Sequence, residues 1–442
     1  MAFLHKDSHV CAKSELDLFN LPLTDESSES GDYLEIHPVS STKDGGVIEF
    51  VVPPASGDYY YDVANTLLYL VVQLVVPSLA TGEAAPAVPK AGPVNNWPHA
   101  LFDHIQVLLN GKDTTSGSHC YGYKAYIDTI LGYDLPAQQS HLTTRLFAKD
   151  TAFEFNSRDA RNKGYEARAN ALSDNRSVDI ISNLHCDFFG QERYLINGVE
   201  MKLRLHRSKT AFHVMASRDA QVDVRIHTAK LLIRRVKINP SILLAHHKAL
   251  ESASAKYPIT RVDMKVLTLN AGIRSKVMDS VYLGPQPRRV VMGLVDNNAF
   301  NGDLEENPWN FVNSDVCHLA VFSGGNQIPS QPLTPDFTHP KSPLYVTAYH
   351  SLFSGTGIHF KDEGININRS EYPGGYCLYA FDLTPNLSSH TGLWNLQKTG
   401  SLRIEIRFKS ELAKAVNLIV YSEFDSLIEI DKYRNVQTDF AN

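Results

Sequence analysis

The sequence predicts an all-β protein built from two tandem β-sandwiches of similar size. Short runs of β-branched and aromatic residues alternate with turn residues along most of the chain, as in antiparallel sheets. Helical periodicity is confined mainly to residues 124–131 and 242–255. The 442 residues exceed the size at which one hydrophobic core usually keeps growing, so two domains of roughly 200 residues each are expected.

Composition and charge indicate a folded protein that does not primarily bind nucleic acid. Hydrophobic residues make up 43% of the chain and charged residues 20%, which is far from a disordered composition. The net charge of -6 argues against neutralisation of phosphates, because that task requires clustered excess cations. We interpret the basic runs at residues 234–237 and Arg288-Arg289 as solvated strand edges. No sequence-specific nucleic-acid partner is expected.

Cysteine usage and hydropathy indicate where the chain is made. The five cysteines are scattered and never form a C-x-x-C pair, which predicts reduced thiols rather than a disulfide framework or a zinc site. The N-terminal segment has no apolar h-region, and the longest apolar run, residues 67–76, is too short to cross a bilayer. We expect synthesis inside a cell, no secretion through a signal peptide and no membrane span.

Residues 1–32 are predicted to form a polar N-terminal arm with one apolar island. The island is Leu16-Asp17-Leu18-Phe19-Asn20-Leu21. Exposed apolar residues in a polar tail need somewhere to be buried, so Leu16, Leu18, Phe19 and Leu21 are the candidate docking residues. The island could equally be a strand that closes a sheet edge.

The first sandwich is predicted over residues 33–245. Its strands are expected at residues 47–52, 67–76, 105–109, 178–189, 199–205 and 222–238. Residues 201–205 alternate apolar side chains with cations, as in a half-buried sheet. Residues 67–76 are nearly all apolar, as expected for a strand in the middle of a sandwich or one covered on both faces. Asn110-Gly111 and Asn197-Gly198 supply residues that tolerate the positive φ of tight hairpins.

The second sandwich is predicted over residues 256–442, after a helical linker at residues 246–255. The linker lies in the helical stretch that follows Pro240, and a new β pattern starts after it. Strands are expected at residues 260–269, 289–295, 316–322, 375–381, 402–408 and 416–424.

Local echoes between the two halves indicate a duplication. Ala125-Tyr126 precedes Gly132 by the same spacing as Ala348-Tyr349 precedes Gly355. In each half, about eight strands of some seven residues would use only about fifty residues, so most of the chain lies in connections. Two eight-stranded jelly rolls with long loops and a few short helices fit this arithmetic. A double jelly roll is therefore the predicted fold class.

No catalytic, cofactor or metal site is predicted. The eighteen histidines contain no H-x-H pair and no H-E-x-x-H motif, and the chain has no G-x-S-x-G elbow. His246-His247 would point in different directions on a helix. The tyrosine-rich residues 59–61 and 372–379 could stack on sugars or bases, but we interpret them as core or interface residues. We expect that the protein is not an enzyme.

Six strings occur in order between about residue 14 and residue 435: SELDLF (14–19), QERYLINGV (191–199), LLAH (243–246), AKYPI (255–259), GLVDNNAFNG (293–302) and SEFD (422–425). They resemble the major capsid proteins of Polinton (Maverick) elements and adintoviruses. Together these strings are far more distinctive than a single short motif.

The resemblance implies a hexon-like structural protein of an icosahedral DNA virus or virus-like transposon, located in the virion. The family that the strings resemble belongs to the double jelly-roll lineage of virophages and adenovirus hexons, which implies homotrimeric, pseudo-hexagonal capsomers. The implied partners are other copies of the chain, penton proteins and minor capsid proteins. The arm would dock on a neighbouring capsomer or minor protein. The long loops at residues 81–93, 153–175 and 329–343 would largely pack against neighbouring subunits.

Two other functions stay open at this point. A carbohydrate-binding or carbohydrate-cleaving β-sandwich protein is the alternative from another class. Such proteins are usually exported, whereas this chain has no signal peptide and unpaired cysteines. A domesticated host protein that keeps the fold without assembling is the weaker third possibility.

Overall fold

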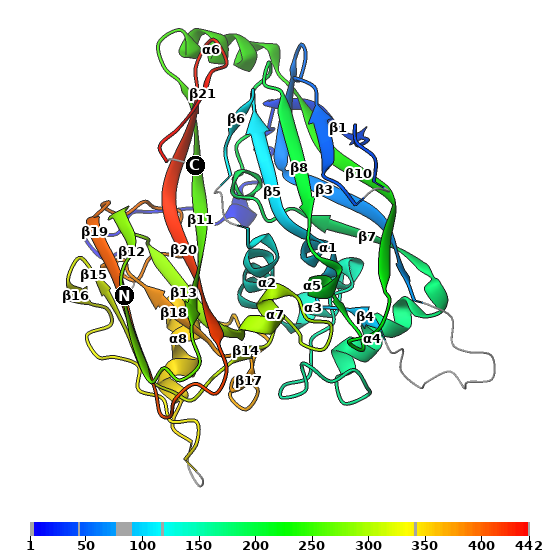
Figure 1. The fold of residues 1–442 in the computed structure, drawn as a ribbon. Helices are drawn as coiled ribbons and strands as arrows, with labels where there is room; N and C mark the ends of the chain where they lie inside the picture. The colour runs from blue at the N-terminus through cyan, green and yellow to red at the C-terminus, as the bar shows by residue number, and fades with distance from the viewer. Residues whose placement is uncertain (1–3, 43–44, 77–90, 116–118, 340–342, 441–442) are drawn as a thin grey trace.

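The computed structural model describes residues 4–42, 45–76, 91–115, 119–339 and 343–440. Two β-sandwiches lie side by side, one from each half of the chain (Figure 1). Every strand pairing between the named strands is antiparallel. The predicted all-β double jelly roll is confirmed.

The first sandwich consists of two four-stranded sheets. In sheet order, one contains β1 (Ser28–Ile36), β10 (Asp223–Ile238), β3 (Tyr59–Val75) and β7 (Ser177–Asn183), and the other contains β2 (Ile48–Val52), β8 (Met201–Arg207), β5 (Phe102–Leu109) and β6 (Lys112–Asp113). Apolar residues of β8 face the core and its cations face outward, as the alternation predicted. Strand β3 lies inside its sheet, between β10 and β7, with one face buried and the other half-buried, which agrees with the predicted strand in the middle of a sandwich.

The second sandwich repeats this arrangement. One sheet contains β11 (Ala255–Leu269), β20 (Val416–Ile430), β13 (Arg289–Asp296) and β18 (Leu378–Asp382), with the short strands β14 (Phe311–Val312), β17 (Gly374–Gly375) and β21 (Val436–Thr438) added to it. The other contains β12 (Ser275–Pro285), β19 (Thr399–Phe408), β15 (Val316–Ser323) and β16 (Asn326–Gln327).

Strand order in the two sandwiches corresponds strand by strand. The order β1-β10-β3-β7 matches β11-β20-β13-β18, and β2-β8-β5-β6 matches β12-β19-β15-β16. Helix α2 (Tyr121–Gly132) follows β6 as helix α8 (Val346–Thr356) follows β16. The echoed pairs Ala125-Tyr126 and Ala348-Tyr349 lie in these two helices, so the echoes mark equivalent places in a duplicated topology.

The remaining elements are short and lie mainly in the connections. They are α1 (Trp97–Ala100), α3 (Leu135–Gln138), α4 (Lys163–Ala171), α5 (Thr210–His213), α6 (Pro240–Leu250), α7 (Asn297–Asn301), the 3-10 turns η1 (Ser14–Leu16), η2 (His141–Arg145), η3 (Ser173–Asn175) and η4 (Asp187–Gly190), and the strand pair β4 (Gly92–Pro93) and β9 (Val214–Met215). Helix α4 was not predicted, because it buries a glycine and an arginine where an amphipathic helix buries apolar residues.

The first five residues of strand β1, residues 28–32, lie in the segment 1–32 that we predicted as the arm. The sequence of β1 is mostly polar, and ion pairs join this strand to β10. Glu29, Asp32 and Glu35 of β1 pair with cations of β10 at 2.6, 2.7 and 2.9 Å. The basic run of β10 therefore neutralises an acidic neighbouring strand, and β10 is not a sheet edge. The arm of the structure comprises the residues before Ser28.

The interpretation of Arg288-Arg289 as a solvated strand edge is wrong. Both side chains are largely buried and form ion pairs with Glu423, and Arg288 also pairs with Asp425 at 2.9 Å. A buried cation needs a nearby opposite charge to offset its lost hydration. The acidic partners lie more than 130 residues away in the sequence, so this pairing is visible only in the folded chain.

Of the two predicted hairpin turns, one is confirmed. Asn110 and Gly111 have φ values of 47° and 80° and join β5 to β6, as a two-residue turn requires. Gly198 also has a positive φ, 77°, but its turn does not join two paired strands. A Cβ at Gly198 would lie 3.1 Å from the Arg434 guanidinium, so this glycine makes room for the Arg434 hydrogen bond to the Asn197 carbonyl.

The connection between the sandwiches is helix α6, at the top of the molecule in Figure 1. It begins at Pro240, and Asn239 caps it by accepting a hydrogen bond from the Ser241 amide. It ends at Leu250, and β11 begins at Ala255. The helix therefore starts and ends earlier than the linker that we predicted at residues 246–255.

Of the predicted long loops, residues 81–90 and 340–342 lie outside the described residues. The loop at residues 153–175 contains α4 and contacts the second half of its own chain. The Phe153 amide donates to the Gly374 carbonyl at 2.7 Å, and the Asn307 amide donates to Asn156 at 2.8 Å. At least part of this loop therefore joins the two sandwiches of one subunit.

Candidate assembly surfaces

The arm before β1 exposes nearly all of its large apolar side chains. The four predicted docking residues, Leu16, Leu18, Phe19 and Leu21, are 70%, 75%, 95% and 91% exposed. The hydrogen bonds within this part of the arm are local, for example from the Asn20 side-chain amide to the Asp17 carboxylate. Leu23 is also fully exposed, and our sequence reasoning missed it because Pro22 ends the island. The arm therefore carries a continuous apolar segment that nothing in its own chain covers among the described residues.

The arm leaves the folded body beside helix α6. Asn239, at the start of α6, donates hydrogen bonds from its backbone to the Ser27 carbonyl and from its side chain to the Glu26 carbonyl, at 3.1 and 3.2 Å. These bonds fix the direction in which the arm emerges.

A groove of about 450 Å³ lies next to this point. Its lining comes from α6, from the first sandwich and from the start of β11: Ser27, Tyr60, Arg193, Tyr194, Ile196, Ile238, Ile242, His246, Ala249, Leu250, Ala253, Ser254, Ala255, Lys256 and Tyr257. His246 stacks on Tyr60 at 5.8 Å, and its Nδ1 lies 3.1 Å from the Tyr60 hydroxyl. The groove is mainly apolar, and Arg193 and Lys256 add two cations to its lining, which suits a peptide with apolar side chains and acidic flanks.

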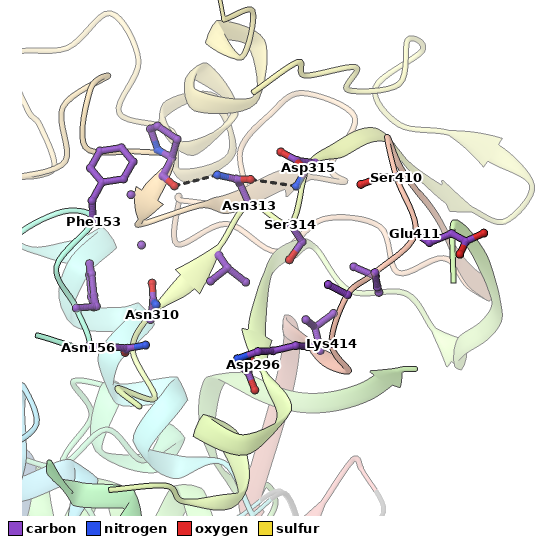
Figure 2. A pocket seen from close by; sticks show the side chains of 18 residues that line it. Phe153, Asn156, Asp296, Asn310, Asn313, Ser314, Asp315, Ser410, Glu411 and Lys414 are labelled. Atoms are coloured by element: carbon purple, nitrogen blue, oxygen red, sulfur yellow. Dashed lines mark hydrogen bonds and ion pairs between the residues drawn. The ribbon is translucent and has the colours of Figure 1, made fainter. Parts of the chain in front are cut away.

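A second recess, of about 540 Å³, opens between the loop at residues 153–156 and the second sandwich (Figure 2). Among the charged residues of its lining, Lys414 lies 3.5 Å from Asp296 and also 3.5 Å from Glu306, which is not part of the lining. Burial and the neighbouring Asp296 raise the pKa of Glu306. Its described lining contains serines but no histidine or cysteine.

The loop between β18 and β19 exposes a second apolar patch. Leu393, Trp394 and Leu396 are 78%, 47% and 93% exposed. This loop has no periodic pattern in the sequence, because isolated apolar residues between turn residues predict neither a helix nor a strand. It is a further candidate contact surface.

The two sandwiches share a buried polar seam around α2. Asp128 of α2 accepts hydrogen bonds from the Tyr421 hydroxyl of β20 at 2.8 Å and from His185 at 3.0 Å. Burial favours the neutral acid, but the His185 hydrogen bond and the Lys124 charge outweigh it and lower the pKa of Asp128. Lys124 pairs with Asp187 at 2.6 Å, and Asp187 accepts from the Val262 amide of β11. Side chains of both halves therefore fix their relative position.

Buried neutral histidines should make the fold sensitive to acid. Burial, together with the charge of Arg207, lowers the pKa of His213 to about 3, and its Nδ1 accepts from the Trp97 indole at 3.4 Å. A histidine of the unfolded chain titrates near 6.5, so the folded state loses stability as the pH falls below about 6.5. At pH 5 the loss from His213 should be about 2 kcal/mol.

Chemical unfolding at pH 7.5 and pH 5.0 measures this effect. We expect His213→Gln, which keeps an acceptor for Trp97, to reduce the pH dependence by about 2 kcal/mol. His247→Gln, on the exposed surface of α6, is the matched control and should leave the pH dependence unchanged. An equal pH dependence in the wild type and His213→Gln would contradict the assignment.

Within the described residues, no group of three or more His, Cys, Asp or Glu side chains could hold a metal ion. The search of the same residues for a helix long and apolar enough to cross a membrane also found none. The five cysteines are free, and Cys11 in the arm is the exposed one. Tyr60 and Tyr61, and Tyr372, Tyr376 and Tyr379, are buried, which confirms the core interpretation for both tyrosine-rich runs.

No family model matches the chain. An uncharacterized protein of Caenorhabditis elegans is 24% identical over 356 residues, which cover 78% of this chain and 81% of that protein.

Several solved viral structures have the same fold. A chain in the Sputnik virophage structure is similar with a TM-score of 0.65 and 10% identity, covering 98% of this chain and 93% of that one. For the faustovirus major capsid protein the TM-score is 0.56, with 9% identity and coverages of 95% and 92%. For the mavirus major capsid protein it is 0.52, with 13% identity and coverages of 100% and 97%. The chain therefore has the double jelly-roll fold of viral major capsid proteins.

Proposed function

We propose that this chain is a major capsid protein, a structural subunit of the shell of an icosahedral DNA virus or virus-like transposon. The observation that carries the proposal is the matching strand order of the two sandwiches, which gives one chain two similar building blocks side by side. The likeness to viral capsid chains over nearly the whole length supports the same function. Its location is then the virion, and its role is not enzymatic.

The Polinton (Maverick) and adintovirus lineage is the finer part of this proposal. It rests on the six ordered strings, four of which lie in or beside structural elements of the two sandwiches and their connection. A similar protein in a nematode supports it, because an integrated virus-like element would leave such a chain among the proteins of an animal.

Electron microscopy of the purified protein, or of cells that express it, tests the function directly. Closed icosahedral particles are the expected result. A soluble protein that binds or cleaves glycans and never forms capsomers would favour the carbohydrate alternative. A folded chain with neither property would favour a domesticated host protein.

The functional unit should be a homotrimer. Three chains supply six similar sandwiches, so a three-fold object can occupy a roughly hexagonal position in a shell. An obligate interface of this kind should bury more than roughly 2,000 Å², so the trimer should persist on dilution. Native mass spectrometry should give three times the chain mass of 49.3 kDa. A stable folded monomer or dimer as the sole species would count against the capsid function.

Deleting the arm should separate capsomer formation from shell formation. We expect a chain that starts at residue 28 to form trimers but few closed shells, because the exposed apolar segment would no longer bind a neighbouring capsomer or a minor protein. The deletion should stop before Ser28, since removing residues 28–32 would also remove half of β1 and its ion pairs. Sedimentation for trimers and electron microscopy for shells are the two readouts.

A variant in which Leu16, Leu18, Phe19 and Leu21 are all replaced by serine is the matched control for the deletion, because it keeps the length and charge of the arm. It should impair shells as the deletion does. Normal shells from either variant would refute the docking role. Penton and minor capsid proteins are the further partners that this function requires.

A further inference from the structure

We propose that the groove beside α6 binds the apolar arm segment, residues 16–23, of a neighbouring copy of this chain. This inference rests on the proposed function, because the donor of the segment is another subunit of the shell.

The chemistry of the groove matches that segment. Apolar and aromatic side chains such as Ile242, Leu250 and Tyr257 line most of it, and a groove of about 450 Å³ is in the range that binds small ligands or several side chains of a peptide. The arm offers Leu18, Phe19 and neighbouring leucines, all largely exposed. Burial of these side chains is the main source of free energy for such binding.

Charge also favours this occupant. The apolar segment has Glu15 before it, Asp17 within it, and Asp25 and Glu26 after it. The groove has Arg193 and Lys256 in its lining. Opposite charges at the ends of a groove fix the direction and register of a bound peptide more than they increase its affinity.

The connection of the arm to the body favours a neighbour as donor. Among the described residues, the arm contributes only Ser27 to the lining of the groove, and the rest of it lies exposed. Seven residues separate Phe19 from Glu26, and an extended chain of that length spans up to about 25 Å. That reach is enough to cross a contact between adjacent subunits. An exchange of arms would then bury both the segment and the groove.

Cross-linking between two singly substituted chains tests the proposal. Both chains carry Cys11→Ser, which removes the exposed thiol of the arm. One chain also carries Phe19→Cys and the other Ala249→Cys, at a position that lines the groove. The control replaces Ala249→Cys with Leu244→Cys, which is 71% exposed on the same helix and does not line the groove. The chains are mixed before assembly, oxidised and separated without reductant.

We expect a covalent dimer with Ala249→Cys at a yield about tenfold or more above that with Leu244→Cys, because docking raises the local thiol concentration. Equal yields, or no dimer in shells that are closed by electron microscopy, would overturn the groove as the receptor. An internal cross-link that forms only when Phe19→Cys and Ala249→Cys are in one chain would overturn the neighbour as donor. If the unsubstituted chain forms no capsomers, the proposed function fails, and the exchange of arms fails with it.

Discussion

Trp309→Ala should destabilise the protein by about 3–5 kcal/mol. Trp309 belongs to the second half but is fully buried against the first. Its ring stacks on Tyr126 of α2 at 4.7 Å and meets Tyr123 edge-on at 5.1 Å. Its indole nitrogen donates to the Asn95 carbonyl at 2.8 Å. Alanine would leave a cavity at the seam and a buried carbonyl without its donor.

Denaturant unfolding checks this prediction, and the shape of the transition is informative. Because Trp309 holds α2 against the second sandwich, the variant should also unfold less cooperatively, with the two halves separating first. Trp394→Ala is the matched control, since Trp394 is 47% exposed in the loop between β18 and β19. Trp309→Phe should have an intermediate effect, because it keeps an aromatic ring and loses the hydrogen bond. Equal stability of the Trp309→Ala and Trp394→Ala variants would contradict the role of the seam.

Arg168→Met should cost about 3–5 kcal/mol as well, for an electrostatic reason. Arg168 of α4 pairs with Asp150 at 2.7 Å, and both side chains are at most 1% exposed. The guanidinium also donates to the carbonyls of Pro93 and Ala148. Methionine has similar length and no charge, so it would leave a buried carboxylate and two carbonyls without this donor. The cost of uncompensated buried charge outweighs the apolar burial that methionine gains.

Arg161→Met is the control for this prediction, because it removes the same group from an exposed pair. Arg161 pairs with Asp159 at 2.9 Å, with side chains 65% and 51% exposed, and such pairs contribute little to stability. The double variant Arg168→Met/Asp150→Leu should recover part of the loss, since it removes both charges. Thermal and chemical unfolding of the four proteins gives the comparison. A loss in Arg161→Met as large as in Arg168→Met would contradict the argument.

Local patterns of the sequence determined the secondary structure of both sandwiches. Most long strands follow runs of β-branched and aromatic residues, because a pleated, half-buried surface favours those side chains. The turn at Asn110-Gly111 follows from its residues alone. Two long strands escaped prediction. Strand β1 is polar and depends on the cations of β10, and β12 contains few apolar residues at regular spacing.

The sequence also determined that the arm carries apolar residues without an obvious core. The alternative that the island closes a sheet edge does not occur in this chain, because residues 16–21 form no strand and stay exposed. The partner of the arm is decided by contacts between subunits. The sequence could indicate only that a partner is needed.

The tertiary structure alone decided how the two sandwiches join. The Trp309 stack on Tyr126, the bond from Tyr421 to Asp128 and the bond from the Val262 amide to Asp187 each join residues that are far apart in the chain. No local pattern encodes such a partner, because a buried charge or ring is satisfied by whatever the fold brings next to it. The groove beside α6 exists for the same reason, since its lining residues are spread along the chain from Ser27 to Tyr257. Short-range periodicity thus specified the strands, and long-range packing specified the surfaces through which this chain would assemble.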